Sequence, residues 1–106
     1  MAKLVRVVRI SREEAARRLG DVPDDKRFWS NDGGIIKNLR ELAMSLNSMS
    51  AETYQYHRDE GRSDFSKWVR EVVGDDQLAE ELGKAASREQ AGRAVAKRIS
   101  FLESRT

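Results

Sequence analysis

Helix-capping residues recur along this chain at short intervals. A Ser, Asn or Asp side chain at a helix start accepts a hydrogen bond from a free backbone amide of the first turn. Such residues precede segments of helical character at Ser11, Asn38, Ser50, Ser63, Asp75 and Ser87. A Glu or Gln three residues later completes a capping box after Ser11, Asn38 and Ser87. The intervals leave room only for short helices, so the sequence predicts a mainly α-helical chain with about five to six of them.

Apolar residues behind these caps follow the i, i+3, i+4, i+7 spacing of one helix face. Glycines at positions 20, 74 and 83 are expected to end helices, and Gly20 is expected to adopt the left-handed conformation. The predicted core consists of Leu39, Leu42, Leu46, Phe65, Trp68, Val69, Val72, Leu78, Leu82, Val95, Ile99 and Leu102.

Two short segments lack helical spacing and favour β-structure. The pair Asp32-Gly33 separates Phe28–Ser30 from Gly34–Ile36, and such a pair readily adopts the positive φ of a tight hairpin turn. The segment Lys3–Ile10 is rich in β-branched residues, although basic residues recur there every three positions, and we favour a strand. The expected fold class is therefore mainly α with a small β-hairpin, an α+β domain.

Length and composition exclude several classes of protein. The chain has 106 residues, which fits one domain over residues 1–106, with an N-terminal strand and helix segment at 1–27 and a core at 28–106. It contains no cysteine, so disulfides, thiolate metal sites and a cysteine nucleophile are excluded. Its apolar runs are shorter than the about 20 residues of a membrane helix, and no signal peptide is evident. We expect a cytoplasmic protein.

Charge is distributed unevenly along the sequence. Residues 1–31 and 84–106 carry more basic than acidic side chains, whereas residues 32–83 are acidic overall. A solvated surface explains such a distribution most simply, but basic ends that converge could bind phosphates. The candidate residues for sequence-nonspecific nucleic-acid binding are Arg6, Arg9, Arg12, Arg93 and Lys97.

The sequence offers little chemistry for catalysis. His57 is the single histidine, and near a helix end it more often satisfies free carbonyls than acts as an acid or base. The run Asp32-Gly33-Gly34 lacks the glycine spacing of phosphate-binding loops. Asp75-Asp76 with Glu80-Glu81 is interpreted as a helix start and an acidic solvent face. We predict no catalytic residue, no cofactor and no metal site.

Binding to another protein is the favoured function. Short loops between helices often expose side chains together, and interface energy concentrates in aromatic anchors. We therefore expect a non-enzymatic protein-interaction or regulatory module, which binds an unidentified protein or a second copy of itself. The candidate partner-binding residues are Trp29, Tyr56, His57, Asp59 and Arg62.

A set of short motifs supports the same view. The most distinctive are Tyr56-His57, Asp64-Phe65 with Trp68-Val69, and Gly74-Asp75 with Leu78-Ala79. Further matching residues are Phe28-Trp29, Asp32-Gly33, Asn38-Leu39, Glu41-Leu42, Met49-Ser50 and Ser87-Arg88-Glu89. With these motifs the stretch from Phe28 to Leu102 resembles a family of small, functionally uncharacterised helical proteins and appended domains of bacteria and archaea. The resemblance implies no activity, cofactor or catalytic residue.

Overall fold

A computed structural model describes residues 9–106 as a layered arrangement of six α-helices and two small β-hairpins. The helices are α1 (Arg12–Leu19), α2 (Leu39–Ser48), α3 (Ala51–His57), α4 (Asp64–Trp68), α5 (Asp76–Lys84) and α6 (Arg88–Glu103). A 3₁₀ turn, η1 (Asp24–Lys26), precedes the first hairpin, and a π-helical turn, η2 (Val69–Val73), continues α4. The expected fold class, mainly α with a small hairpin, is confirmed.

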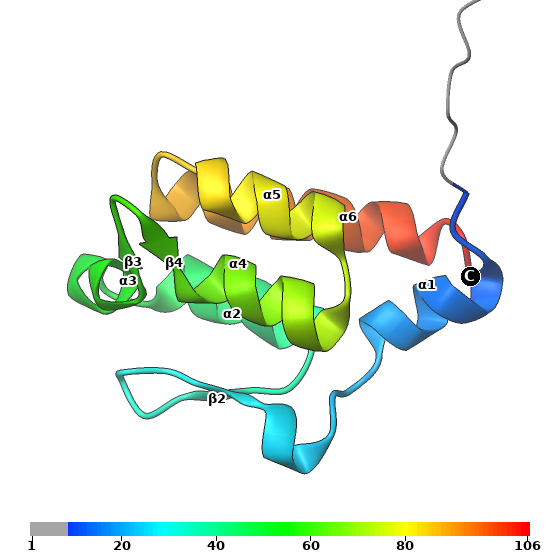
Figure 1. Cartoon of the computed structure of the whole chain (residues 1–106), viewed down its shortest axis with the longest axis horizontal. Helices are drawn as coiled ribbons and strands as arrows, with labels where there is room; N and C mark the ends of the chain where they lie inside the picture. Colours follow the sequence, from blue (N-terminus) through cyan, green and yellow to red (C-terminus); the bar gives the residue numbers. More distant parts are fainter. Residues whose placement is uncertain (1–8) are drawn as a thin grey trace, which may run out of the picture.

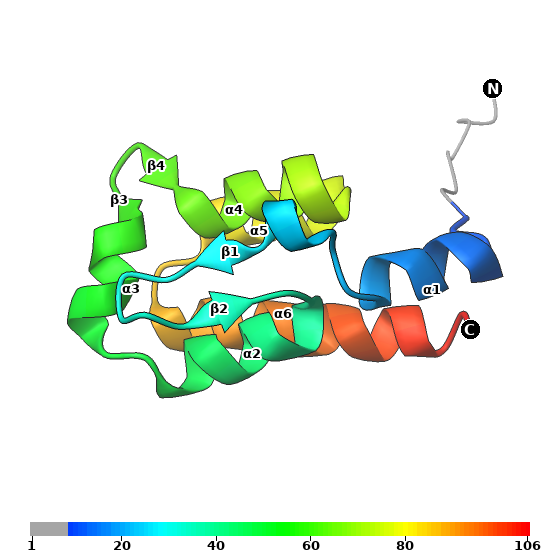
Figure 2. The same ribbon diagram turned by 90° about the horizontal axis from the view of Figure 1, so that it is seen from below.

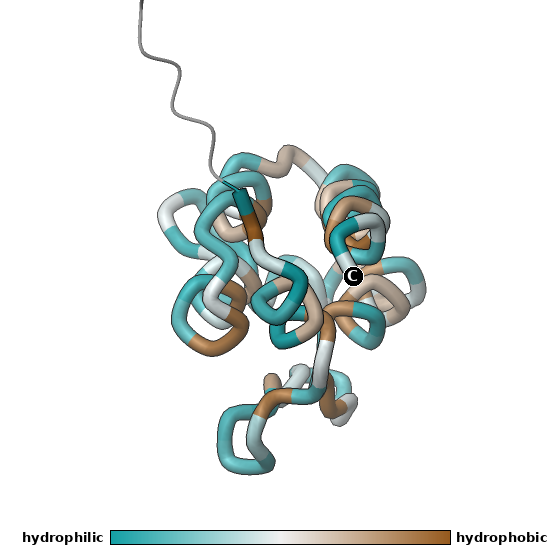
Figure 3. The backbone as a smooth tube through the Cα atoms, turned by 90° about the vertical axis from the view of Figure 1, so that its right-hand side faces the viewer, coloured by the Kyte–Doolittle hydropathy of each residue, from teal (hydrophilic) through white to brown (hydrophobic). Residues whose placement is uncertain are grey.

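The long helix α6 packs along α2 and against α1 and α5, while α4 packs on α5. Figure 1 shows α1 beside the C-terminal end of α6, at the opposite end of the molecule from α3. The hairpin β1 (Phe28–Trp29) and β2 (Ile35–Ile36) lies below the helices in Figure 1, and in Figure 2 it runs in front of them, with α4 on one side and α2 on the other. Around the turns of the helices, hydrophilic and hydrophobic positions alternate (Figure 3), as expected of amphipathic elements.

All six predicted capping residues act as helix N-caps. Each side chain accepts a hydrogen bond from the backbone amide three residues later, at 2.8 to 3.1 Å. After Asn38 and Ser87, the predicted capping-box residues also accept a backbone hydrogen bond, from Lys37 to Glu41 at 2.9 Å and from Ala86 to Gln90 at 3.1 Å. Local side-chain chemistry therefore sets where these helices begin.

The predicted core is buried with one exception. Val72 is only partly buried, and Val73 takes its place inside. The reason is the π-helical turn, in which the amide of Gly74 donates to the carbonyl of Val69 at 2.8 Å, five residues back. The wider turn contains an extra residue, so the inward position moves one residue along the chain.

The first hairpin forms with the predicted turn. Gly33 has a φ of +92°, and the register pairs Phe28 with Ile36 and Trp29 with Ile35. Because side chains alternate along a strand, Phe28 and Ile36 are buried while Trp29 and Ile35 are exposed.

Several expectations for the connecting segments are wrong. Gly20 ends α1 in an extended conformation, with φ −79° and ψ 173°, because its amide donates to the carbonyls of Ala16 and Arg17 without a left-handed residue. Gly83 lies inside α5, which continues to Lys84, whereas Gly74 does adopt a positive φ of 81°. A second hairpin, β3 (Arg58–Asp59) and β4 (Arg62–Ser63), forms where no strand was predicted.

The expected strand at Lys3–Ile10 lies mostly outside the described residues, and Arg9 and Ile10 form no regular element. Within the described part of the chain, the helices are too short and too polar to cross a membrane.

Truncation of Trp68 tests how far the stability of the domain depends on the predicted core. The residue is 7% exposed, its ring packs edge-on against Phe28 with centroids 6.0 Å apart, and its indole nitrogen donates to the carbonyl of Lys26 at 2.8 Å. Truncating a buried aromatic typically costs about 3 to 5 kcal/mol, so Trp68→Ala should largely unfold the domain. Thermal or urea unfolding measures the loss. Met44→Ala, at a side chain that is 70% exposed, is the matched control and should leave stability nearly unchanged.

Candidate functional site

An exposed tryptophan on the first hairpin borders an open cleft. Trp29 is 68% exposed, and the cleft beside it has a volume of about 310 Å³. We call this the Trp29 cleft. Trp68 and Val72 contribute apolar surface to its lining, whereas the charged lining residues are balanced in sign, with Arg27 and Lys67 against Asp64 and Glu71.

His57 holds the hairpin in this position. Its Nε2 accepts a hydrogen bond from the amide of Asn31 at 2.9 Å, and its Nδ1 lies 3.0 Å from a carboxylate oxygen of Asp64. Because an amide can only donate, the bond to Asn31 assigns the proton of the neutral ring to Nδ1. The ring also packs against Phe28 and Phe65, with centroids 5.0 and 5.4 Å away. The expectation that His57 is exposed to a partner is therefore wrong, since the side chain is buried. It instead fixes the hairpin to α3 and α4 through its two hydrogen bonds.

The other candidate residues extend from this histidine. Tyr56 is 58% exposed, and its ring packs edge-on against His57 with centroids 5.0 Å apart. Arg62 donates to the carbonyl of Tyr56 at 2.9 Å and forms an ion pair with Asp59 at 3.4 Å. Direct contacts therefore link four of the five predicted partner-binding residues, and the cleft joins Trp29 to His57.

Sequence reasoning missed the helical wall of the Trp29 cleft. Asp64, Lys67 and Glu71 lie on α4 and η2 at spacings of three and four residues, and all three line the cleft. Their helical spacing was visible in the sequence, but nothing in it indicated that the hairpin would lie beside that face.

The residues proposed for nucleic-acid binding come from two parts of the described chain, the start of α1 and the exposed side of α6, where Arg93 and Lys97 lie one turn apart. Arg6 lies outside the described residues, and Arg9 and Arg12 are exposed at the start of α1. Arg93 lines a groove between α2 and α6, whereas Lys97 lines another groove beside α5.

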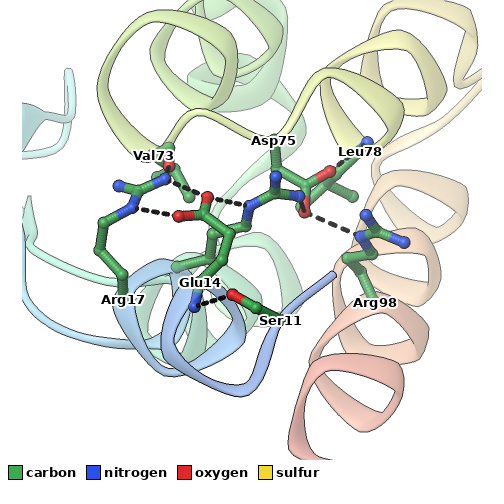
Figure 4. A network of polar contacts seen from close by, with 8 residues as sticks. Ser11, Glu14, Arg17, Val73, Asp75, Leu78 and Arg98 are labelled. Atoms are coloured by element: carbon green, nitrogen blue, oxygen red, sulfur yellow. Dashed lines mark hydrogen bonds and ion pairs between the residues drawn. The ribbon is translucent and has the colours of Figure 1, made fainter. Parts of the chain in front are cut away.

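Other basic side chains near the two ends bind carboxylates of the protein itself (Figure 4). Asp75 is completely buried, and one of its carboxylate oxygens lies 2.8 Å from Nε of Arg98 and 3.1 Å from Nη1 of Arg18. Arg18 also binds Glu14 at 2.7 Å, and Arg17 joins Glu14 at 2.6 Å. Asp75 therefore starts the helix as predicted, but it is not part of a solvent face, because arginines from α1 and α6 enclose it.

This network favours ionised carboxylates. Hydrogen bonds from Arg17 and Arg18 lower the pKa of Glu14 to about 2. Burial alone would raise the pKa of Asp75. Hydrogen bonds from Arg98 and the Leu78 amide, together with the charges of Arg98 and Arg18, outweigh burial and lower that pKa below its usual value.

No cluster of three or more His, Cys, Asp or Glu side chains suited to a metal ion occurs in residues 9–106. Comparisons with protein-family models, curated proteins and solved structures found no match. The resemblance of Phe28–Leu102 to small proteins of bacteria and archaea therefore stays a prediction.

Asp75→Asn tests the buried charge. Asparagine is also a good N-cap, so the variant keeps that role but leaves Arg98 without its buried partner. Removing one member of a buried pair typically costs about 3 to 5 kcal/mol, and chemical unfolding should show a loss of that order. Asp76→Asn, at the exposed neighbouring position, is the matched control. Equal stability of the two variants would contradict a structural role for the Asp75 charge.

Glu14 provides a test by pH. Its pKa of about 2 lies below the ordinary value of 4.5, so the folded state favours the ionised form. The resulting stability is present above pH 4.5 and is lost as the pH falls toward 2. Because Glu14 is partly exposed, solvent screening reduces its share to about 1 kcal/mol. The loss of unfolding free energy between pH 6 and pH 3 should be smaller in Glu14→Gln than in the unmodified protein, whereas Glu13→Gln should change it little.

Proposed function

We propose that this chain is a non-enzymatic protein-interaction module that binds one apolar side chain of a partner in the Trp29 cleft. The observation that carries the proposal is the exposure of Trp29, whose neighbours Phe28 and Ser30 are buried. Interface energy concentrates in a few aromatic residues beside apolar pockets, which is the arrangement at Trp29. Tyr56 extends the same surface beyond His57.

The hydrogen bonds of His57 support this function. A docking surface must present its anchors in a fixed geometry, because ordering them on binding would cost affinity. The hydrogen bonds of His57 to the hairpin and to Asp64 supply that rigidity. With both ring nitrogens engaged, His57 is not free to act as a general base, which supports a binding role over a catalytic one. We also propose that the protein is located in the cytoplasm.

Sequence-nonspecific nucleic-acid binding is the less favoured function. The exposed residues Arg93 and Lys97 lie one turn apart on α6, but Glu89 lines the groove beside Arg93 and Glu81 the groove beside Lys97. Three arginines near the two ends, Arg17, Arg18 and Arg98, already bind carboxylates of the protein itself. Less positive charge therefore remains for phosphates than the sequence indicates.

Affinity capture with matched variants tests the proposal. The unmodified protein, Trp29→Ala and Met44→Ala are immobilised and incubated with nuclease-treated native lysate. Truncating an aromatic anchor typically weakens binding by about 2 kcal/mol or more, so Trp29→Ala should lose partners that Met44→Ala retains. Sedimentation measurements on the same three proteins show whether a second copy is the partner.

Retention of the same proteins by Trp29→Ala would contradict the proposal. Tight binding of arbitrary duplex DNA or RNA at physiological salt, abolished by Arg93→Glu with Lys97→Glu, would instead establish the nucleic-acid alternative.

A further inference from the structure

A second cleft lies on the other side of the α4 helix from the hairpin, between β3–β4, α4 and α5. Its volume is about 550 Å³. Its carboxylate side chains are Glu60 and Glu80. We call it the basic cleft because it is also lined by Arg58, Arg62, Lys67, Arg70 and Lys84.

All of these cations come from the part of the sequence that is acidic overall or from the residue that follows it. Lys67 of α4 and Arg70 of η2 lie three residues apart, and both line this cleft. The fold thus concentrates positive charge on one surface, although the net charge of this sequence segment is negative.

The cations differ in what they already bind. Arg58 is structural, because its guanidinium donates to the carbonyl of Gly83 at 2.7 Å and holds the β3–β4 hairpin against α5. Lys84 is paired with Glu80 at 2.8 Å. Lys67 and Arg70 are exposed and form no ion pair with any residue in the described range 9–106. These two cations are therefore available to a ligand.

The two clefts share one lining residue. Lys67 lines both the Trp29 cleft and the basic cleft, so a chain that places an apolar side chain beside Trp29 brings its neighbouring residues near Lys67. The complementary group for Lys67 and Arg70 is an anion.

We propose that the partner is an acidic peptide segment. Its apolar side chain occupies the Trp29 cleft, and its adjacent carboxylates bind Lys67 and Arg70 in the basic cleft. This inference rests on the protein-interaction function proposed above. Glu60 and Glu80 in the lining, together with Asp64 and Glu71 beside Trp29, would oppose a densely charged phosphate backbone more than a peptide with a few spaced carboxylates. No aromatic side chain lines the described basic cleft for base stacking.

An array of random short peptides, with acidic, neutral and basic sequences equally represented, tests the inference without knowledge of the natural partner. The unmodified protein should prefer acidic peptides that contain an aromatic or large aliphatic residue. Reversal of two exposed charges with Lys67→Glu and Arg70→Glu should weaken that binding about tenfold. The control Arg93→Glu with Lys97→Glu makes the same change in net charge on α6 and should leave it unchanged. Thermal unfolding confirms that both double variants are folded.

The outcomes separate this inference from the function on which it rests. If Trp29→Ala abolishes peptide binding but the protein has no preference for acidic sequences, the interaction function stands and the acidic partner is wrong. If peptide binding is independent of Trp29, the interaction function proposed for the Trp29 cleft is wrong. Displacement of the peptides by random single-stranded RNA, lost in the Lys67 and Arg70 variant, would assign the basic cleft to nucleic acid and overturn the proposal.

Discussion

The buried carboxylate of Asp75 joins the parts of this protein that are most distant in sequence. It caps α5 through the amide of Leu78 and binds Arg18 of α1 and Arg98 of α6. A buried charge is costly unless it is fully paired, so the three helices must meet in one arrangement for Asp75 to be satisfied. The docking of α1 beside α6 depends on this condition, because only Ala15 and Leu19 of α1 are buried.

At the other end of the molecule, His57 has a comparable role for the hairpin. Its two ring nitrogens connect the hairpin turn to α4, and its ring packs on Phe28 and Phe65. With the inner face of the hairpin held in this way, alternation along the strand directs Trp29 outward. The exposed aromatic is thus a consequence of a buried polar contact.

The α4 helix separates two chemically different clefts. The hairpin supplies an apolar wall on one side, while β3–β4 and α5 supply arginine and lysine side chains on the other. Lys67 belongs to both, which makes the pair suitable for one extended ligand with apolar and anionic groups. The amphipathic pattern of α4 and η2 thus serves the core through Phe65 and Trp68 and the surface through Lys67 and Arg70.

Capping chemistry and apolar spacing were sufficient to predict the helix starts, most of the core and the Gly33 turn, because each depends on neighbours within a few residues. The same local reasoning failed at Val72, where a π-helical turn moved the inward position to Val73, and at Asp75 and Arg98, whose burial depends on each other across the fold. The placement of Trp29 beside α4 and the gathering of cations around Lys67 were also beyond local reasoning. Only tertiary packing decides these features, since burial and charge proximity are relations between segments that spacing along one segment does not encode.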